Sequence, residues 1–249
     1  MSNLEILSFT DGAALAEAAA TRWLAELTDW PTNSPNRCVA LAGGRITQVF
    51  FTAVTQLVRS SPGWPADMHF FWGDERCVPP TDAESNFAVA NEFLLQSIGV
   101  PETRIHRLRG EERPEFAAVQ AEAELRRFAP LNAVGQPVFD LILLGMGEDG
   151  HVASLFPGEP EATMASPAVY RAVTAVKPPP QRITLGYAAV AAARQVWVLA
   201  SGPGKAAALD ESLKTEGTTP LARVIQLRDK TVIFTDLKTS IGGQVPFGS

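Results

Sequence analysis

Short apolar runs that do not alternate with polar residues are the feature that most limits how this chain can fold. Three such runs cover residues 37–44, 68–76 and 138–147, and segments with helical spacing separate them. A strand that is apolar on both sides must be buried on both faces, which is typical of a parallel sheet covered by helices. The pattern therefore predicts an α/β fold with a mainly parallel sheet.

The rest of the chain continues this alternation. Further strands are expected at 103–110, 169–176, 194–202 and 230–236, and helices at 11–27, 45–60, 85–99, 114–129, 188–193 and 204–213. Asp11 and Ser85 are expected to cap the first and third of these helices, and Gly99 is expected to end the third. No linker or repeat interrupts the pattern, so we predict a single domain over residues 1–249.

Composition argues against several classes of function. The net charge is −6 and no basic run exceeds two residues, so a nucleic-acid partner is not expected. The two cysteines, Cys38 and Cys77, lie in no CxxC or Cys/His cluster, which argues against a disulfide scaffold and a zinc site. No membrane span or signal peptide is evident. We expect a cytoplasmic protein that contacts no membrane.

Four groups of polar or glycine residues directly follow predicted strands. They are Gly43-Gly44, residues 74–76, the turn 145–151 and Ser201-Gly202. Ligands of open parallel sheets bind beyond the carboxyl ends of the strands. We therefore expect these four groups to lie along one edge of the sheet.

Basic residues near these strand ends indicate a phosphate site. Gly43 and Gly44 would let backbone N–H groups approach a phosphate at a helix N-terminus. Arginine and lysine side chains could add charge-assisted hydrogen bonds. A tight turn, a local ion pair or ordinary surface charge would explain each residue alone, but together they favour a phosphate pocket. The basic candidates are Arg45, Arg76, Arg182 and Lys205.

The charged end of the second apolar run favours a cleft at that position. Asp74 and Arg76 follow the buried sequence HFFW, where ionisable side chains are unusual unless they face a ligand or each other. Asn86 is expected near the same edge. A local ion pair is the alternative interpretation.

His151 is the candidate base. It follows Glu148 and Asp149 in a glycine-rich turn after the most apolar strand. Imidazole titrates near neutral pH, and a neighbouring carboxylate can orient it, so either acid is a candidate partner. His69 and His106 lie within strand-like segments and are expected to be hydrogen-bonded structural residues. No metal-ligand spacing is evident around His151.

These motifs together resemble those of the 6-phosphogluconolactonases, which share a family with the glucosamine-6-phosphate isomerases. The resemblance runs in order from about residue 10 to 236 and is carried by the Gly43-Gly44 turn, FFWGDERCVPPTDAESNF (70–87), FDLILLGMGEDGHVASLFPG (139–158), RITL (182–185) and SGPGKAAAL (201–209). It implies a Rossmann-like three-layer sandwich of the kind found in glucosamine-6-phosphate deaminase and ribose-5-phosphate isomerase. It also implies a monomer or weak homo-oligomer.

The implied activity is that of a carboxylic-ester hydrolase of the oxidative pentose phosphate pathway. Such an enzyme converts 6-phospho-D-glucono-1,5-lactone to 6-phospho-D-gluconate without a metal or organic cofactor. His151 matches the general base proposed for the family, and Arg76, Lys205 and the Gly43-Gly44 loop match the surroundings of its phosphate. Asp74 and Asp149 match residues on the sugar side of the pocket.

Two details of the mechanism are expected from this resemblance. Backbone N–H groups of the turn 145–151, Gly147 among them, are expected to stabilise the oxyanion of the tetrahedral intermediate. The first loop reads GGRITQ, with Ile46 where the family commonly has a hydroxyl. Backbone N–H groups and Arg45, or Thr47 in a shifted loop, are therefore the expected phosphate ligands.

Two other functions remain as alternatives. A glucosamine-6-phosphate deaminase shares the GxGxDGH pattern, but the sequence SLFPG after His151 is that of the lactonases. A non-catalytic sugar-phosphate-binding domain of a transcriptional regulator would need a helix-turn-helix domain, which we do not expect in the ten residues before the first predicted helix. The presence of both His151 and the acidic pair also favours catalysis.

Overall fold

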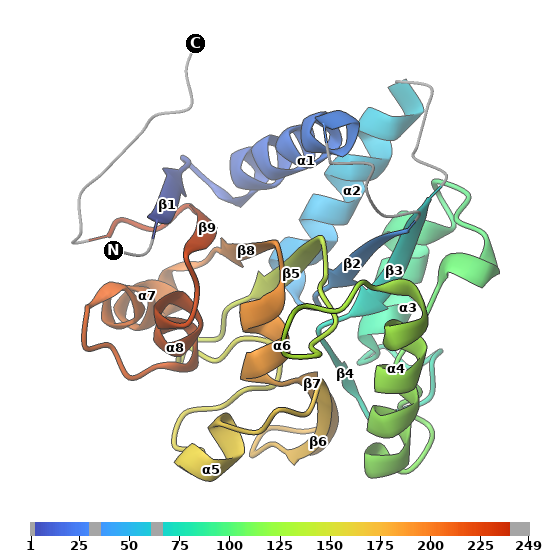
Figure 1. Ribbon diagram of the computed structural model, residues 1–249. Coiled ribbons are helices and arrows are strands. Elements are labelled where there is room, and N and C mark those ends of the chain that lie inside the picture. Colours follow the sequence, from blue (N-terminus) through green and yellow to red (C-terminus); the bar gives the residue numbers. More distant parts are fainter. Residues whose placement is uncertain (1–2, 30–35, 61–66, 240–249) are drawn as a thin grey trace.

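Six parallel strands form the main sheet of the protein. The computed structural model describes residues 3–29, 36–60 and 67–239. The strand order is β1-β9-β8-β5-β2-β3, and every neighbouring pair is parallel (Figure 1). The strands are β1 (Asn3–Ser8), β2 (Arg37–Leu41), β3 (Met68–Trp72), β5 (Leu141–Gly145), β8 (Gln195–Ala200) and β9 (Lys230–Thr235). This sheet confirms the predicted α/β class. The edge strand β1 was not predicted; its sequence NLEILS is not one of the purely apolar runs from which the other strands were recognised.

Helices cover both faces of this sheet, as Figure 1 shows. On one face, α1 (Gly12–Asp29) packs against α2 (Arg45–Ser60). On the other lie α6 (Tyr187–Ala192), α7 (Ala206–Leu213) and α8 (Pro220–Gln226). One continuous cluster of buried apolar side chains joins these layers to the strands. The three-layer arrangement follows from strands that are apolar on both faces.

A small antiparallel sheet departs from the predicted pattern. It has the order β4-β7-β6, with β4 (Asp74–Arg76), β7 (Gln181–Leu185) and β6 (Tyr170–Thr174), and α4 (Pro114–Phe128) packs on it. The predicted strand 68–76 is thus two strands that separate at Gly73. There the backbone bonds to Leu41 of the main sheet through its N–H and to Leu185 of the small sheet through its C=O. The predicted strand 169–176 lies in this small sheet, and β7 was not predicted.

The segment between β4 and α4 contains short helices. Ser85 caps α3 (Asn86–Ala90), as predicted, and the π-helix η1 (Asn91–Leu95) continues it until Gly99, at φ +68°, ends the turn. The predicted strand 103–110 is wrong. The short 3₁₀ helix η2 (Glu102–Arg104) takes its place, and only an isolated bridge joins Phe70 to Ile105. The chain then turns at Gly110, whose N–H bonds to Leu108, so a strand cannot extend.

The remaining elements are small. The helix α5 (Glu161–Met164) precedes the small sheet's hairpin, and the 3₁₀ helix η3 (Pro203–Lys205) precedes α7. Asp11 caps α1, as predicted, because its carboxylate accepts hydrogen bonds from the N–H groups of Ala13 and Ala14.

The strand order creates a crevice between β2 and β5. From β2 the chain proceeds to β3 on one side and then returns to β5 on the other side of β2. The loops leaving two such strands turn apart, and ligands of doubly wound folds bind where the order reverses. Gly145, at the end of β5, lies so close to Gly43 that an added Cβ would be 3.3 Å from the Gly43 carbonyl oxygen.

Candidate active site

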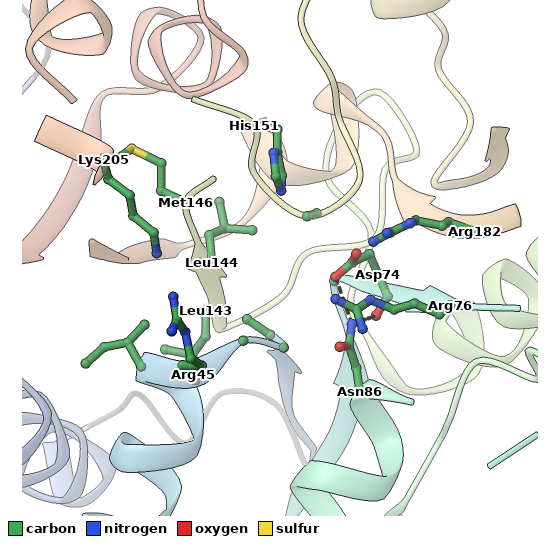
Figure 2. A pocket seen from close by; sticks show the side chains of 17 residues that line it. Arg45, Asp74, Arg76, Asn86, Leu143, Leu144, Met146, His151, Arg182 and Lys205 are labelled. Carbon is green, nitrogen blue, oxygen red and sulfur yellow. Dashed lines mark hydrogen bonds between the residues drawn. The ribbon is translucent and has the colours of Figure 1, made fainter. Parts of the chain in front are cut away.

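A pocket opens in this crevice, and nine of the twelve predicted site residues line it (Figure 2). These nine are Gly43, Gly44, Arg45, Asp74, Arg76, Asn86, His151, Arg182 and Lys205. Gly147, Glu148 and Asp149 do not line it. The pocket also contains residues that were not predicted, namely Ala42, Ile46, Gly73, Leu143, Leu144, Gly145, Met146 and Ala153. These are small or apolar and carry no chemical signal, although each lies within a few positions of a predicted residue. Three of the four groups expected at one edge of the sheet thus contribute to this pocket; Ser201-Gly202 does not line it, although Lys205, three residues further on, does.

The turn after β5 presents His151 to the pocket. The N–H of Gly147 donates to the carbonyl of His151 at 2.9 Å, and the N–H of Gly150 donates to the carbonyl of Gly147 at 3.1 Å. A Cβ on Gly147 would lie 2.1 Å from the imidazole ring, so only glycine fits beneath His151. Gly150 has φ +79°, in the region that favours glycine. The glycines of the turn therefore set the position of the histidine.

Asp149 orients the imidazole from outside the pocket. Its carboxylate accepts the N–H of His151 Nδ1 at 2.5 Å and the backbone N–H of His151 at 3.2 Å. Burial alone would raise the pKa of Asp149, but the hydrogen bond and charge of His151 outweigh it and lower that pKa. With Nδ1 engaged, Nε2 is the nitrogen available for proton transfer. Figure 2 shows His151 between the Arg45–Lys205 side of the pocket and the side that holds Asp74 and Arg182.

Glu148, the other candidate partner, points elsewhere. A Cβ on Gly204 would lie 2.7 Å from its Oε1 atom, so Glu148 lies against η3. There its charge favours the protonated form of Lys205. The sequence left open which of the two acids contacts His151. In this structure Asp149 is the one that is hydrogen-bonded to the imidazole.

The Gly43-Gly44 loop begins α2 and lies against Asn86. A Cβ on Gly43 would be 1.9 Å from the Oδ1 atom of Asn86, so a larger residue would displace that side chain. Gly44 has φ +101°. The hydroxyl of Thr47 donates to the Gly43 carbonyl at 2.9 Å, and Thr47 is fully buried. Thr47 is therefore part of the helix start and lies outside the pocket lining.

Arg45 and Lys205 extend toward each other from opposite walls, as Figure 2 shows. Burial lowers the pKa of Lys205 and the charge of Arg45 lowers it further, while Asp236 and Glu148 oppose the shift. Among the described residues neither side chain has a carboxylate within salt-bridge distance. Two cations that approach each other beside a helix N-terminus, with no carboxylate in salt-bridge distance, have a geometry that suits an anion.

Asp74 is buried and held by polar neighbours. Its Oδ2 atom accepts the hydroxyl of Ser154 at 2.6 Å, and its Oδ1 atom accepts the amide of Asn86 at 3.2 Å. The amide of Asn86 also donates to the Asp74 carbonyl at 2.9 Å. Both carboxylate oxygens therefore have protein donors, which fix the side chain at the pocket wall.

Arg76 and Arg182 face each other on neighbouring strands. They are direct register partners in the antiparallel pair of β4 and β7, and both line the pocket. Arg182 donates through Nε to the carbonyl of Pro179 at 3.1 Å, and Arg76 donates through Nη1 to the carbonyl of Glu84 at 2.6 Å. Burial, and then the charge of Arg76, lowers the pKa of Arg182.

Glu75 has a structural role between these two pocket residues. Its carboxylate accepts hydrogen bonds from the N–H groups of Arg76, Asn86 and Phe87 and from the hydroxyl of Ser85. It thereby ties β4 to the start of α3. Burial raises the pKa of Glu75 despite these donors.

His69 and His106 are hydrogen-bonded structural residues, as expected. His69 Nδ1 lies 2.9 Å from His106 Nε2, and His106 Nδ1 lies 2.9 Å from Glu124 Oε1. Burial, and then the charge of His106, lowers the pKa of His69 to about 4. Both rings pack against aromatic neighbours: His106 stacks on Phe71, and Phe128 lies tilted against both histidines.

The described residues contain neither a candidate metal site nor a candidate membrane-spanning helix. Within 3–29, 36–60 and 67–239, no group of three His, Cys, Asp or Glu side chains could hold a metal ion. No helix in those same ranges is both long and apolar enough to cross a membrane.

The fold and the residues that line the pocket define a doubly wound α/β protein. Its pocket is rich in cations, contains an oriented histidine and lies where the strand order reverses, between β2 and β5. The chain belongs to the family of glucosamine-6-phosphate isomerases and 6-phosphogluconolactonases, whose model matches residues 10–234. A 6-phosphogluconolactonase of Streptomyces coelicolor is 35% identical over 220 residues, which cover 86% of this chain and 84% of that protein.

Solved structures agree with this membership. The 6-phosphogluconolactonase of Trypanosoma brucei has a TM-score of 0.79 and 27% identity, over 94% of this chain and 97% of that one. A monomeric glucosamine-6-phosphate deaminase has a TM-score of 0.76 at 19% identity, over 93% of this chain and 97% of that one, which shows a shared fold. The expected Rossmann-like sandwich and the family resemblance are thus confirmed.

Proposed function

We propose that this protein is a hydrolase that converts 6-phospho-D-glucono-1,5-lactone to 6-phospho-D-gluconate, as the lactonases of its family are named for doing. The observation that carries the proposal is the imidazole of His151, bound through Nδ1 to Asp149 and lining a pocket with four cationic side chains. The cations suit a sugar phosphate, and the free Nε2 atom suits activation of water.

The phosphate is proposed to bind at the N-terminus of α2. Arg45 and Lys205 approach each other there, next to the Gly44 backbone, and a phosphate between them would remove their mutual repulsion. Arg76, which the sequence pattern also placed at the phosphate, is labelled on the other side of the pocket in Figure 2, next to Asp74 and Arg182. We therefore propose Arg45, rather than Arg76, as the partner of Lys205.

Bound in this way, the lactone would place its C1 carbon near His151. The Nε2 atom takes a proton from water as the water oxygen bonds to C1, and the carbonyl electrons move onto the C1 oxygen. When the tetrahedral intermediate collapses, the bond from C1 to the ring oxygen breaks, and the imidazolium returns the proton to that oxygen. Asp149 stabilises the imidazolium between these steps. The product acid then ionises in water.

The proposal is tested with freshly formed lactone. Glucose-6-phosphate dehydrogenase generates the lactone in place, and 6-phosphogluconate dehydrogenase reports product as a second phase of NADPH formation. Added protein should accelerate that phase, and His151→Ala should lower kcat by about a hundred- to ten-thousand-fold. Binding of 6-phosphogluconate and the melting temperature should change little in that variant.

Three outcomes would contradict the proposal. Folded protein that gives no acceleration over spontaneous hydrolysis would exclude the lactonase activity. Release of ammonia from glucosamine 6-phosphate would instead indicate the deaminase, and binding of sugar phosphates without turnover would indicate a binding domain. A His151→Ala variant with wild-type kcat would show that another group is the base.

A further inference from the structure

The oxyanion of the tetrahedral intermediate needs hydrogen-bond donors, and several N–H groups of the turn after β5 already have other partners. The N–H groups of Gly147 and Gly150 donate to carbonyls inside the turn, and the N–H of His151 donates to Asp149. Three of the donors expected to stabilise the oxyanion are therefore already used within the turn. Side-chain donors elsewhere in the pocket lining are therefore candidates for this role.

The distribution of charged side chains in the pocket lining indicates which residues could donate hydrogen bonds to the oxyanion. The pocket lining contains four cations, Arg45, Arg76, Arg182 and Lys205, and one acid, Asp74. Outside the lining, Glu84 forms a salt bridge with Arg76, and Asp236 and Glu148 act on Lys205. A phosphate ester brings about two negative charges, which the Arg45–Lys205 pair can balance. Hydrolysis then creates one more negative charge at C1, first on the oxyanion and finally on the product carboxylate. The second pair of cations corresponds to this additional charge.

We infer that Arg76 and Arg182 form a guanidinium pair that binds the negative charge arising at C1, first the oxyanion and then the product carboxylate. The inference rests on the proposed lactonase function. The pair exchanges no proton in this role. It stabilises charge that appears only as the lactone reacts, which lowers the barrier instead of merely tightening substrate binding.

The position of Arg182 relative to the base supports this role. The Phe156 ring lies 5.1 Å from the His151 ring, centroid to centroid, and 6.0 Å from the Arg182 guanidinium carbon. One aromatic ring thus contacts both the base and the guanidinium. His151 and Arg182 also line the same pocket, so a carbon attacked by water at His151 is proposed to have its oxygen on the side of Arg182.

The two guanidinium groups are held in place and still keep free donors. The carbonyls of Lys177, Pro179 and Glu84 accept some of their N–H groups and fix their planes. The Nε atom of Arg76 is buried and has no hydrogen-bond partner within the described part of the chain. A guanidinium fork matches the two oxygens of a carboxylate, which suits the product.

Asp74 does not neutralise the pair. Its two oxygens accept hydrogen bonds from Ser154 and Asn86, and no salt bridge joins it to either arginine among the described residues. It does lie close enough to raise the pKa of Arg182 slightly against the effect of burial and of Arg76. Arg76 forms a salt bridge with the exposed carboxylate of Glu84, from Nη1 to Oε2 at 3.2 Å. Arg182 has no salt bridge among the described residues and keeps its charge at the pocket wall.

The test compares two ligands that differ only at C1. 6-Phosphogluconate carries a carboxylate there, and glucitol 6-phosphate carries a neutral hydroxymethyl group. Their Kd values are measured by calorimetry for the wild type, Arg76→Gln, Arg182→Lys and Lys205→Met, and a melting temperature is recorded for each. Arg76→Gln, at the less buried of the two arginines, keeps the test informative if Arg182→Lys does not fold.

The two arginine variants should lose selectivity for the carboxylate. Their Kd for 6-phosphogluconate should rise about 10- to 150-fold, with little change for glucitol 6-phosphate. Lys205→Met should weaken both ligands equally, because they share the phosphate. In Arg76→Gln, kcat for the lactone should fall by about a hundred- to a thousand-fold, the cost of removing one oxyanion donor.

Equal weakening of both ligands in the arginine variants would overturn the inference and place Arg76 and Arg182 at the phosphate. The binding comparison needs no turnover. A wild-type protein that discriminates the two ligands through these arginines but does not hydrolyse lactone would refute the proposed function alone. If the wild type hydrolyses the lactone but the arginine variants lose no selectivity for 6-phosphogluconate over glucitol 6-phosphate, this inference alone would be refuted.

Discussion

Replacement of Asp149 by asparagine is expected to slow turnover without changing substrate binding. The carboxylate lies 2.5 Å from His151 Nδ1 and outside the pocket lining, so it acts on substrate only through the imidazole. Asparagine retains a similar size and an acceptor oxygen. It removes the negative charge that stabilises the imidazolium during the reaction.

The magnitude follows from the exposure of the pair. A hydrogen bond to a charged group contributes about 1.5–3 kcal/mol when it is shielded from solvent. The Asp149 side chain is 44% exposed, so water screens part of this interaction. We therefore expect a loss of about 1–2 kcal/mol in the transition state, or about 5- to 30-fold in kcat.

The adjacent acid supplies a matched control. Glu148→Gln removes the same charge one residue earlier, but Glu148 lies against Gly204 and interacts with Lys205. Its loss should leave kcat unchanged and lower KM slightly, because the Arg45–Lys205 pair becomes more positive toward the phosphate. Both variants are measured in the coupled NADPH assay.

The pH dependence gives a second check. The pKa of Asp149 is lowered, so the carboxylate stays ionised at every pH above its ordinary value of 3.8. The loss of kcat in Asp149→Asn should therefore be present throughout the neutral pH range. A wild-type kcat in Asp149→Asn, or a larger loss in Glu148→Gln, would refute the assignment of Asp149 as the orienting acid.

Two further predictions concern stability. Gly43→Ala should cost about 1–3 kcal/mol and reduce activity, because the new Cβ would lie 1.9 Å from Asn86 Oδ1 and displace the amide from Asp74; an unchanged melting temperature and rate would contradict this. The pKa of His69, lowered to about 4, means that the unfolded chain binds a proton first as the pH falls below the ordinary value of 6.5. Stability from this group is therefore present above pH 6.5 and lost as the pH falls toward 4, by about 2 kcal/mol between pH 7 and 5. Urea unfolding at a series of pH values should show this loss of stability. If a His69→Gln variant had the same pH dependence as the wild type, His69 would be excluded as the source of the loss, and His106 would remain.

The positions of the site residues could be predicted because they depend on strand ends. Apolar runs marked β2, β3 and β5, and parallel strands bring their carboxyl ends to one edge. Nine of the twelve predicted site residues meet there for this reason. The apolar lining from Leu143 to Met146 could not be selected, because residues of a buried strand look alike in sequence whether or not they border a pocket.

Partnerships between side chains could not be predicted, because they depend on local turns and on sheet register. Glu148 and Asp149 are equivalent in sequence, and only the conformation of the turn directs one to His151 and the other to Gly204. The strand β7 follows the prolines at 178–180 and pairs with a segment about a hundred residues earlier in the chain, which no local pattern reveals.

The break at Gly73 has the largest functional consequence of these unpredicted features. A continuous strand 68–76 would have kept Arg76 in the main sheet, far from any partner specified by the sequence. Because β4 leaves that sheet, it pairs with β7 and sets Arg76 opposite Arg182. The pocket thus receives one pair of cations from the loops of the parallel sheet, Arg45 and Lys205, and another from the antiparallel sheet. In the mechanism proposed above, the first pair binds the phosphate at C6 and the second binds the charge that forms at C1. His151 lies between the two pairs, where the proposed reaction takes place.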